Sequence, residues 1–385
     1  MRQLLLLICF LPVAGLAADA TPRARDLGVP FDGTPGPMNA ITDVPGVTVG
    51  HSTIIEDYKN GSAARTGVTA IMPRGEDSVM LPVFSGTAVL NGAGEMTGTL
   101  WVEASGFLEG PVMITTTHSV GMVFEETIKW RVNKAEPDPT GYAWSDPVVA
   151  ETWGGRLNDE KGFYVRPEHV IEAIESARSG PVEEGNVGGG TGMVCYQFKC
   201  GIGTASRVIE TVDGEFTVGV LVQANYGWRE LLQIAGVPVG REIPVDQVAD
   251  IRTPMDDEMG SVIVVIATDA PLLPHQLKRV ATRAGLGIAR VGGMASNGSG
   301  DIFIAFSTAN PQELRAGTNL SARLLGNEHV TPVFSGAVLA TEEAIVNALV
   351  AARTMTGFEG ATIEAIDHEE LRSALRKYNR LEESR

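Results

Sequence analysis

The dipeptide Gly260-Ser261 places a hydroxyl nucleophile between an acidic, proline-containing segment and a run of apolar residues. If the Ser261 hydroxyl attacks the carbonyl of Gly260, the peptide bond becomes an ester, and its hydrolysis frees a chain that begins at Ser261. Glycine has no side chain to obstruct this attack or the backbone distortion that it needs. The freed α-amine has an ordinary pKa of about 7.7–8.0, so it can serve as base for its own hydroxyl. The pair therefore predicts self-cleavage followed by nucleophilic catalysis.

Gly-Ser is also a common linker dipeptide, so the prediction depends on what other chemistry the chain offers. The sequence has no G-x-S-x-G elbow and no H-E-x-x-H pair, and its six histidines are scattered. His118 follows a predicted strand and has the chemistry of a base, but we favour a hydrogen-bonded structural histidine there. No metal and no organic cofactor are expected at the site.

The glycine-rich segment 185–192 departs from the two common phosphate-binding patterns. It does not match G-x-G-x-x-G, and it lacks the Lys-Ser/Thr ending of a P-loop. Two interpretations stay open: a tight backbone passage beside a substrate pocket, which makes Gly189 and Gly190 candidate binding residues, or a simple turn.

The elements that must position these residues are short apolar strands and a few well-marked helices. Several strands are apolar on both faces, which indicates sheets covered on both sides. The strands are predicted at 47–55, 68–72, 112–117, 217–223, 262–268 and 302–307. Helices are predicted from Pro167, from Pro274 to a stop at Gly285, from a Thr341 cap to Gly357, and from an Asp367 capping box. The linker predicted at 241–258 separates the bulk of the chain from Ser261.

The amino terminus has the layout of a cleavable secretory signal. Arg2 precedes a short apolar run from Leu4 to Leu16, and the small residues Ala17 and Ala20 follow it. The run falls short of the roughly 20 apolar residues that cross a bilayer. We predict a signal peptide at residues 1–20 and a periplasmic or secreted protein.

Charge and cysteine content limit the possible partners. The formal net charge of -17 argues against nucleic acid and anionic membranes, which require clustered cations, and suits a substrate with a free ammonium group. Cys195 and Cys200 can form a disulfide if residues 196–199 make a tight turn. The interpretation that we favour is two unpaired thiols on one strand, pointing to opposite faces.

Several segments together resemble the DmpA-type family, which comprises L-aminopeptidases with D-amino-acid esterase/amidase activity and includes the β-peptidyl aminopeptidases. The resemblance runs from about Ile41 to Tyr378. It is carried by Ile41–His51, Leu90–Gly98, Gly188–Met193, Gly201–Ser206, Gly260-Ser261 and Ser296–Asp301.

The resemblance implies a four-layer αββα sandwich like that of N-terminal-nucleophile hydrolases. It implies one domain over residues 21–385, self-cleaved into chains 21–260 and 261–385, and a homo-oligomer that is usually a tetramer of these heterodimers. Ser261 matches the nucleophile, and Ser299 and Asp301 match the pair that orients it and its amine. Asn225 matches the amide that donates to the oxyanion, a role that its place at the end of an apolar strand also allows.

The resemblance also points to Glu151 and Trp153 as substrate-binding residues. Glu151 matches the carboxylate that holds the free ammonium of the substrate, which selects for substrates with an amine at that distance. Relatives usually have tyrosine where Trp153 stands. Indole can donate a hydrogen bond but cannot accept a proton, so the substitution bears on oxyanion assistance and substrate choice.

The residues and the resemblance lead to one prediction and two alternatives. We predict an aminopeptidase or amidase that releases N-terminal residues from short peptides, amides or esters through an acyl-enzyme on Ser261. The first alternative is an acyltransferase of the ornithine-acetyltransferase-like type, whose members use threonine. The second is a catalytically inert family member with a binding role, which only Trp153 favours.

Overall fold

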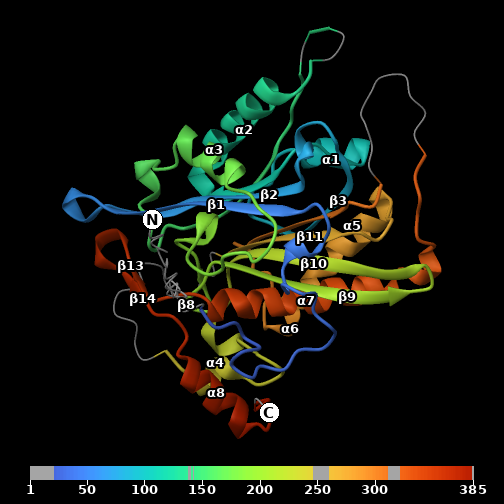
Figure 1. The fold of residues 1–385 in the computed structure, drawn as a ribbon. Coiled ribbons are helices and arrows are strands. Elements are labelled where there is room, and N and C mark those ends of the chain that lie inside the picture. The colour runs from blue at the N-terminus through green and yellow to red at the C-terminus, as the bar shows by residue number, and fades with distance from the viewer. Residues whose placement is uncertain (1–20, 138–139, 142, 246–259, 311–320, 384–385) are drawn as a thin grey trace, which may run out of the picture.

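Two β-sheets stacked face to face form the centre of the molecule, and helices cover both outer faces (Figure 1). The computed structural model describes residues 21–137, 140–141, 143–245, 260–310 and 321–383. The four-stranded sheet has the order β1 (Thr48–Asp57), β2 (Ala63–Glu76), β5 (Val112–Thr116), β6 (Val148–Thr152). The six-stranded sheet has the order β4 (Phe107–Leu108), β3 (Val83–Gly92), β12 (Gly300–Ser307), β11 (Ser261–Thr268), β10 (Gly214–Asn225), β9 (Ile202–Thr211). The predicted αββα sandwich is confirmed.

Strand β11 shows why the apolar runs lack a polar face. All eight of its residues are buried. Ile263 and Val265 belong to the core between the two sheets, whereas Val262 and Val264 belong to the core between the six-stranded sheet and its helices. A strand covered on both faces needs apolar side chains at every position, as the sequence predicts for this segment.

The helices divide between the two outer faces. Helices α2 (Val120–Lys134) and α3 (Pro167–Glu175) pack on the four-stranded sheet, where Val123, Val170 and Ile174 are buried. Helices α5 (Pro274–Thr282) and α7 (Thr331–Val350) pack on the six-stranded sheet, and α6 (Ala284–Arg290) packs on α7 (Figure 1). The remaining elements are α1 (Thr99–Ser105), α4 (Val239–Glu242), α8 (His368–Lys377), β7 (Val194–Cys195), β8 (Phe198–Lys199), β13 (Met355–Thr356) and β14 (Thr362–Ile363).

The helix starts at Pro167, Pro274 and Asp367 are confirmed, but three other helix boundaries are wrong. Helix α7 begins at Thr331 and ends at Val350 instead of Gly357, and Thr341 lies inside it with its hydroxyl donated to the Ala337 carbonyl. A threonine can satisfy its hydroxyl in this way within a helix, so it does not mark a cap by itself. Gly285 does not end a helix, because it keeps a negative φ and α6 continues through it.

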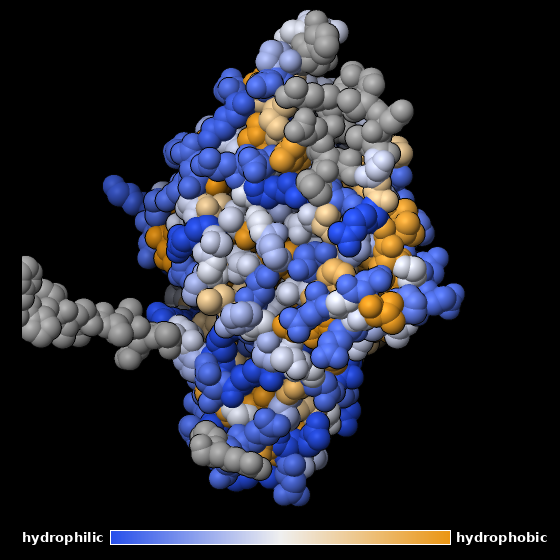
Figure 2. Space-filling view, turned by 45° about the vertical axis from the view of Figure 1, so that its right-hand side comes forward, coloured by the Kyte–Doolittle hydropathy of each residue, from blue (hydrophilic) through white to orange (hydrophobic). Residues whose placement is uncertain are grey.

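Helix α7 is also the one helix of the described residues that is long and apolar enough to cross a membrane. Most of its residues are buried between the six-stranded sheet and the neighbouring helices, so packing in the core accounts for its composition. The face shown in Figure 2 is mainly polar, and apolar side chains form only small, separate groups on it.

Cys195 and Cys200 form a disulfide, so the favoured interpretation of two free thiols on one strand is wrong. Cys195 and Cys200 lie on either side of a short hairpin made by β7 and β8, with their Cα atoms 5.4 Å apart. Tyr196 and Gln197 occupy the two-residue turn, and both have a positive φ. This turn reverses the chain, whereas the rejected interpretation assumed that it continues as one strand.

Two sequence predictions fall outside the described residues. The signal peptide at residues 1–20 lies there, and so does the part of the predicted linker at 246–258.

Candidate active site

Ser261 is the first residue of β11 and lies between two other segments that the sequence singles out. It is paired with Asn225 at the end of antiparallel β10 and with Gly300 at the start of parallel β12. Its side chain is only 4% exposed. The ends of three adjacent strands therefore bring together residues that are far apart in the sequence.

The hydroxyl of Ser261 lies beside the carbonyl that self-cleavage requires it to attack. With the Gly260-Ser261 peptide bond in place, Ser261 Oγ donates to the Gly260 carbonyl oxygen at 2.7 Å. The Gly300 N–H donates to the same carbonyl oxygen at 3.1 Å and lies 3.4 Å from Ser261 Oγ. A donor in this position can stabilise the negative charge that develops on the Gly260 oxygen during attack.

The backbone at the end of β10 comes so close to position 260 that only glycine fits there. A Cβ atom at this position would lie 2.8 Å from Tyr226 Cα and 2.9 Å from the Asn225 carbonyl oxygen. Neither atom can move without shifting the end of β10. The glycine before the nucleophile therefore has a structural reason here in addition to the chemical one.

The side-chain amide of Asn225 is held by two main-chain groups. Asn225 Oδ1 accepts from the Val194 N–H at 2.9 Å, and Asn225 Nδ2 donates to the Trp153 carbonyl at 3.0 Å. Because the amide accepts in one contact and donates in the other, its orientation is fixed. The second proton on Nδ2 can be donated to an oxyanion formed next to Ser261.

Ser299 and Asp301 lie on either side of Gly300, the residue paired with Ser261. The Ser299 hydroxyl donates to Asp301 Oδ1 at 2.8 Å, and both side chains are buried. The predicted pair is therefore assembled and placed in the segment next to the nucleophile. Its predicted role in orienting the hydroxyl and amine of Ser261 stays a prediction.

Glu151 is a buried carboxylate at the end of β6. The Glu95 N–H donates to Glu151 Oε1 at 3.1 Å, and the Thr117 hydroxyl donates to Glu151 Oε2. Burial raises the pKa of Glu151 above its ordinary 4.5, although these two donors oppose the change. A Cβ on Gly94 would lie 3.1 Å from Glu151 Oε1 and 3.0 Å from Gly300 Cα, which places the carboxylate near the nucleophile segment.

Trp153 takes part in the site through its main chain. Its carbonyl accepts the Asn225 amide, a contact that does not involve the side chain at this position. The half-buried indole lies over Gly155, where a Cβ would come within 2.3 Å of the ring. The orientation of Asn225 therefore depends on the main chain at position 153 and not directly on the indole.

The glycine run forms a buried turn between the two sheets. Gly188–Gly190 make a 3-10 turn, and a Cβ on Gly189 would lie 2.3 Å from Gln223 Oε1. Gln223 Nε2 in turn donates to the Thr152 hydroxyl at 2.8 Å. The run thus supports the end of β6, and direct contact of Gly189 or Gly190 with a substrate stays a prediction.

Sequence reasoning missed three groups that position the site. Thr117, Gly300 and the Val194 N–H contact Glu151, Ser261 and Asn225, respectively. Thr117 ends the strand predicted at 112–117, and a polar residue at the end of a buried strand is a signal that could have found it. The two backbone donors leave no signal, because an N–H group is the same whatever the side chain.

His118 is exposed, and its Nδ1 bonds to the Glu160 carbonyl at 3.2 Å, in agreement with a structural histidine. Among the described residues, no three potential metal ligands are grouped.

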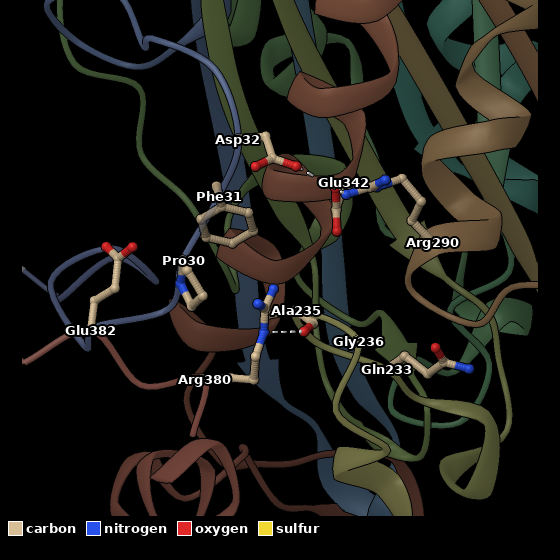
Figure 3. Close-up of a pocket in the computed structure, with 10 residues that line it drawn as sticks. All are labelled: Pro30, Phe31, Asp32, Gln233, Ala235, Gly236, Arg290, Glu342, Arg380 and Glu382. Atoms are coloured by element: carbon tan, nitrogen blue, oxygen red, sulfur yellow. Dashed lines mark hydrogen bonds and ion pairs between the residues drawn. The ribbon is translucent and has the colours of Figure 1, made fainter. Parts of the chain in front are cut away.

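A cavity of about 490 Å³ lies elsewhere, between the amino-terminal segment, α7 and the carboxy-terminal segment (Figure 3). Its wall includes Arg290, which is ion-paired with Glu342, and Arg380, which donates to the Ala235 carbonyl. No predicted site residue lines this cavity. It is therefore separate from the Ser261 region.

Comparison with known proteins decides the family. The model of peptidase family S58 matches residues 39–363. The chain belongs to peptidase family S58. Its relatives include the beta-peptidyl aminopeptidase BapA of Sphingosinicella microcystinivorans, which is 52% identical over 96% of both chains. The resemblance noted from the sequence motifs is confirmed.

Solved structures of S58 relatives agree with the fold. The L-aminopeptidase D-Ala-esterase/amidase of Ochrobactrum anthropi, described as a variant of the Ntn hydrolase fold, is 49% identical with a TM-score of 0.86. The match covers 94% of this chain and 99% of that one. A Burkholderia sp. beta-aminopeptidase is 46% identical with a TM-score of 0.84, over 92% and 99% of the chains. This S58 member is thus an N-terminal-nucleophile aminopeptidase that acts on peptides or amides.

Proposed function

We propose that this S58 aminopeptidase is exported, cleaves itself before Ser261, and works through an acyl-enzyme on that residue. The observation that carries the proposal is the position of Ser261 Oγ, which lies 2.7 Å from the Gly260 carbonyl oxygen and opposite Asn225. Export is supported by the amino-terminal signal pattern. The acidic net charge is compatible with substrates that carry an ammonium group.

Self-cleavage exchanges one bond for another before water completes the step. Ser261 Oγ bonds to the Gly260 carbonyl carbon, the Gly260-Ser261 C–N bond breaks, and the hydroxyl proton is transferred to the departing nitrogen. Water then hydrolyses the ester and leaves a carboxylate on Gly260 and a free amine on Ser261. The Gly300 N–H is the donor placed to stabilise the intermediate oxyanion.

The catalytic cycle repeats this chemistry on a substrate. The Ser261 amine accepts the proton of its own hydroxyl, Oγ attacks the substrate carbonyl, and the Asn225 amide stabilises the tetrahedral oxyanion. The leaving amine or alcohol takes the proton, and water releases the acyl group. Glu151 holds the free ammonium of the substrate, while Ser299 and Asp301 orient the nucleophile. The cycle requires no metal or organic cofactor.

The proposed assembly is a homo-oligomer, a tetramer of heterodimers made of chains 21–260 and 261–385. The substrate is a short peptide, amide or ester with a free amino group. The names of the relatives include β-peptidyl aminopeptidase and L-aminopeptidase D-Ala-esterase/amidase, so β-, L- and D-aminoacyl amides make a suitable panel.

A substrate panel with acyl-enzyme trapping tests the proposal. We expect hydrolysis of aminoacyl amides, a mass increase confined to chain 261–385, and neither in Ser261→Ala. Acetylation of the substrate amine should abolish turnover. Mostly transfer product in the presence of an amine acceptor would favour the acyltransferase, and absence of turnover across the panel would favour an inert binding protein.

A further inference from the structure

We propose that Lys199 and the Cys195–Cys200 hairpin are positioning elements that hold the oxyanion-binding amide of Asn225 in place. The inference rests on the proposed function, in which Asn225 stabilises the oxyanion. It assigns a role to a buried lysine and a disulfide that the catalytic cycle does not use.

The connection runs through the peptide unit between Met193 and Val194. The Val194 N–H donates to Asn225 Oδ1 at 2.9 Å. On the other side of the same unit, the Met193 carbonyl accepts from Lys199 Nζ at 2.8 Å and from the Cys200 N–H at 3.0 Å. Because a peptide unit is planar, fixing its carbonyl oxygen also fixes the direction of its N–H. Lys199 thereby sets the angle at which the Val194 N–H meets Asn225.

The described hydrogen bonds of the Lys199 side chain both stay within the hairpin segment. Its side chain is fully buried, and its ammonium donates to two main-chain carbonyls, those of Met193 and Cys200, the latter at 2.5 Å. Burial lowers the pKa of Lys199 well below its ordinary 10.5. Both the ammonium and the neutral amine have enough protons for the two bonds. Burying an amine lowers the stability of the folded protein. The place of the Lys199 amine on the Met193 carbonyl therefore indicates that it benefits the site.

The rest of the hairpin keeps this peptide unit rigid. The disulfide joins its two ends, and the Tyr196 N–H donates to the Tyr226 carbonyl at 2.8 Å, next to Asn225. Arg229 donates to the Tyr196 carbonyl at 2.8 Å and stacks on Phe198, with its Cζ atom 3.1 Å from the ring centroid. These contacts hold a turn in which two residues other than glycine have a positive φ, a conformation that is otherwise unfavourable.

The experiment measures kcat and KM of Lys199→Met, using protein whose cleavage before Ser261 is verified by mass. Methionine is similar in length to the lysine side chain and fills the space that it occupies, but it donates no hydrogen bond. We expect kcat to fall roughly tenfold, because a small displacement of one oxyanion donor loses part of its contribution, and KM to change less than about twofold. Val170→Ala on α3, a buried change in the helix layer over the four-stranded sheet, is the stability control and should leave kcat unchanged at a similar loss in Tm.

A double variant separates positioning from general damage. In an Asn225→Ala background, Lys199→Met should lower kcat by less than about twofold, since the amide that it positions is absent. An equal loss of kcat in both backgrounds, or wild-type kcat in the single variant, would overturn the proposal. If wild-type protein is neither cleaved nor active, the proposed function itself fails, so the two failures are distinguishable.

Reduction of the mature enzyme provides a second measurement if Lys199→Met does not fold. A dithiol supplies two electrons and two protons, so that the S–S bond breaks, two thiols form, and the dithiol closes to its own disulfide. Because both cysteines are fully buried, reduction is carried out in mild denaturant, removed before assay, and thiols are counted. We expect kcat to fall several-fold with KM retained and to recover on reoxidation. Unchanged kcat with two thiols present would overturn the proposal.

Discussion

Asn225 and Ser261 are directly paired across the antiparallel strands β10 and β11. One strand ends and the other begins at this pair, so the side-chain amide and the hydroxyl lie at the same end of the sheet. The amide is oriented by the main chains of Val194 and Trp153, which belong to different segments. The amide that we propose as oxyanion donor is therefore fixed before a substrate arrives, which is the condition for strong electrostatic stabilisation.

Asn225→Ala should lower kcat by about 10²–10³-fold, equivalent to roughly 2.7–4 kcal/mol, with a small change in KM. The reason is that the donor acts on charge that exists only in the transition state. Steady-state kinetics on verified, cleaved protein measure this. Asn186→Ala, which removes an asparagine bonded to the Arg353 main chain, is the matched control. A loss confined to KM would place Asn225 in substrate binding.

Gly260→Ala should slow or block self-cleavage. The added methyl group would lie 2.8 Å from Tyr226 Cα, and it would displace the carbonyl that Ser261 must attack. A time course on denaturing gels after synthesis follows the loss of intact chain. Gly121→Ala on α2, where a Cβ meets nothing within 4 Å, should be cleaved at the wild-type rate. Normal cleavage of Gly260→Ala would show that this close approach is unimportant.

Glu151 should add a step of its own to the acid limb of the pH profile of kcat/KM. Another step belongs to the Ser261 amine, which must be neutral to act as base and has an ordinary pKa of about 7.7–8.0. Burial raises the pKa of Glu151 above 4.5, so the carboxyl group is protonated at a higher pH than an ordinary glutamate, and it then loses its attraction for the substrate ammonium. Glu151→Gln should remove the Glu151 step, leave the step of the Ser261 amine, and lower kcat/KM about 10–100-fold at neutral pH.

Glu95→Gln provides the matched control for Glu151. Only the main-chain N–H of Glu95 contacts Glu151, and a glutamine keeps that donor. The Glu151 step of the acid limb should therefore persist in Glu95→Gln. Its disappearance there, or its persistence in Glu151→Gln, would assign the step to another group.

His51 should make the protein sensitive to mild acid. Burial, followed by the charge of Arg178, lowers the pKa of His51 to about 4. The unfolded chain binds a proton below about 6.5 and the folded chain only below about 4, so the free energy of unfolding falls as pH drops between these values. The loss is roughly 3 kcal/mol at most. Denaturant unfolding from pH 7 to 4 measures it.

Two histidine variants test this assignment. His51→Gln should flatten the pH dependence of unfolding, since glutamine does not titrate. His275→Gln, a change on the exposed surface of α5, should leave the dependence as it is in wild type. An unaltered pH dependence in His51→Gln would assign the acid sensitivity to other groups.

The sequence predicted those strands and helices that are marked by a residue pattern within their own segment. Ser261 was identified because glycine precedes it and a buried strand follows, and the strands at 262–268 and 302–307 were found from their apolar runs. Helix α7 was misplaced because its buried surface runs almost all the way around, so no apolar stripe marked its start at Thr331. A helix without a polar face gives no periodic signal.

Contacts made by the main chain were beyond the reach of sequence reasoning. The Gly300 N–H near Ser261 and the Val194 N–H on Asn225 depend on strand register and on a hairpin, not on side-chain type. The disulfide was not favoured because two cysteines five residues apart on one continuous strand point to opposite faces. Tyr196 and Gln197, which make the turn with positive φ, are not among the residues that usually signal such a turn. Tertiary contacts from Arg229 and the Tyr226 carbonyl outweigh that local preference.

N-terminal sequencing and intact mass of the purified, active protein test the central claim most directly. The account predicts a second chain that begins Ser-Val-Ile-Val at Ser261, and a single uncleaved chain without activity for Ser261→Ala. Full activity in wild-type material that carries only one amino terminus, upstream of Gly260, would contradict it.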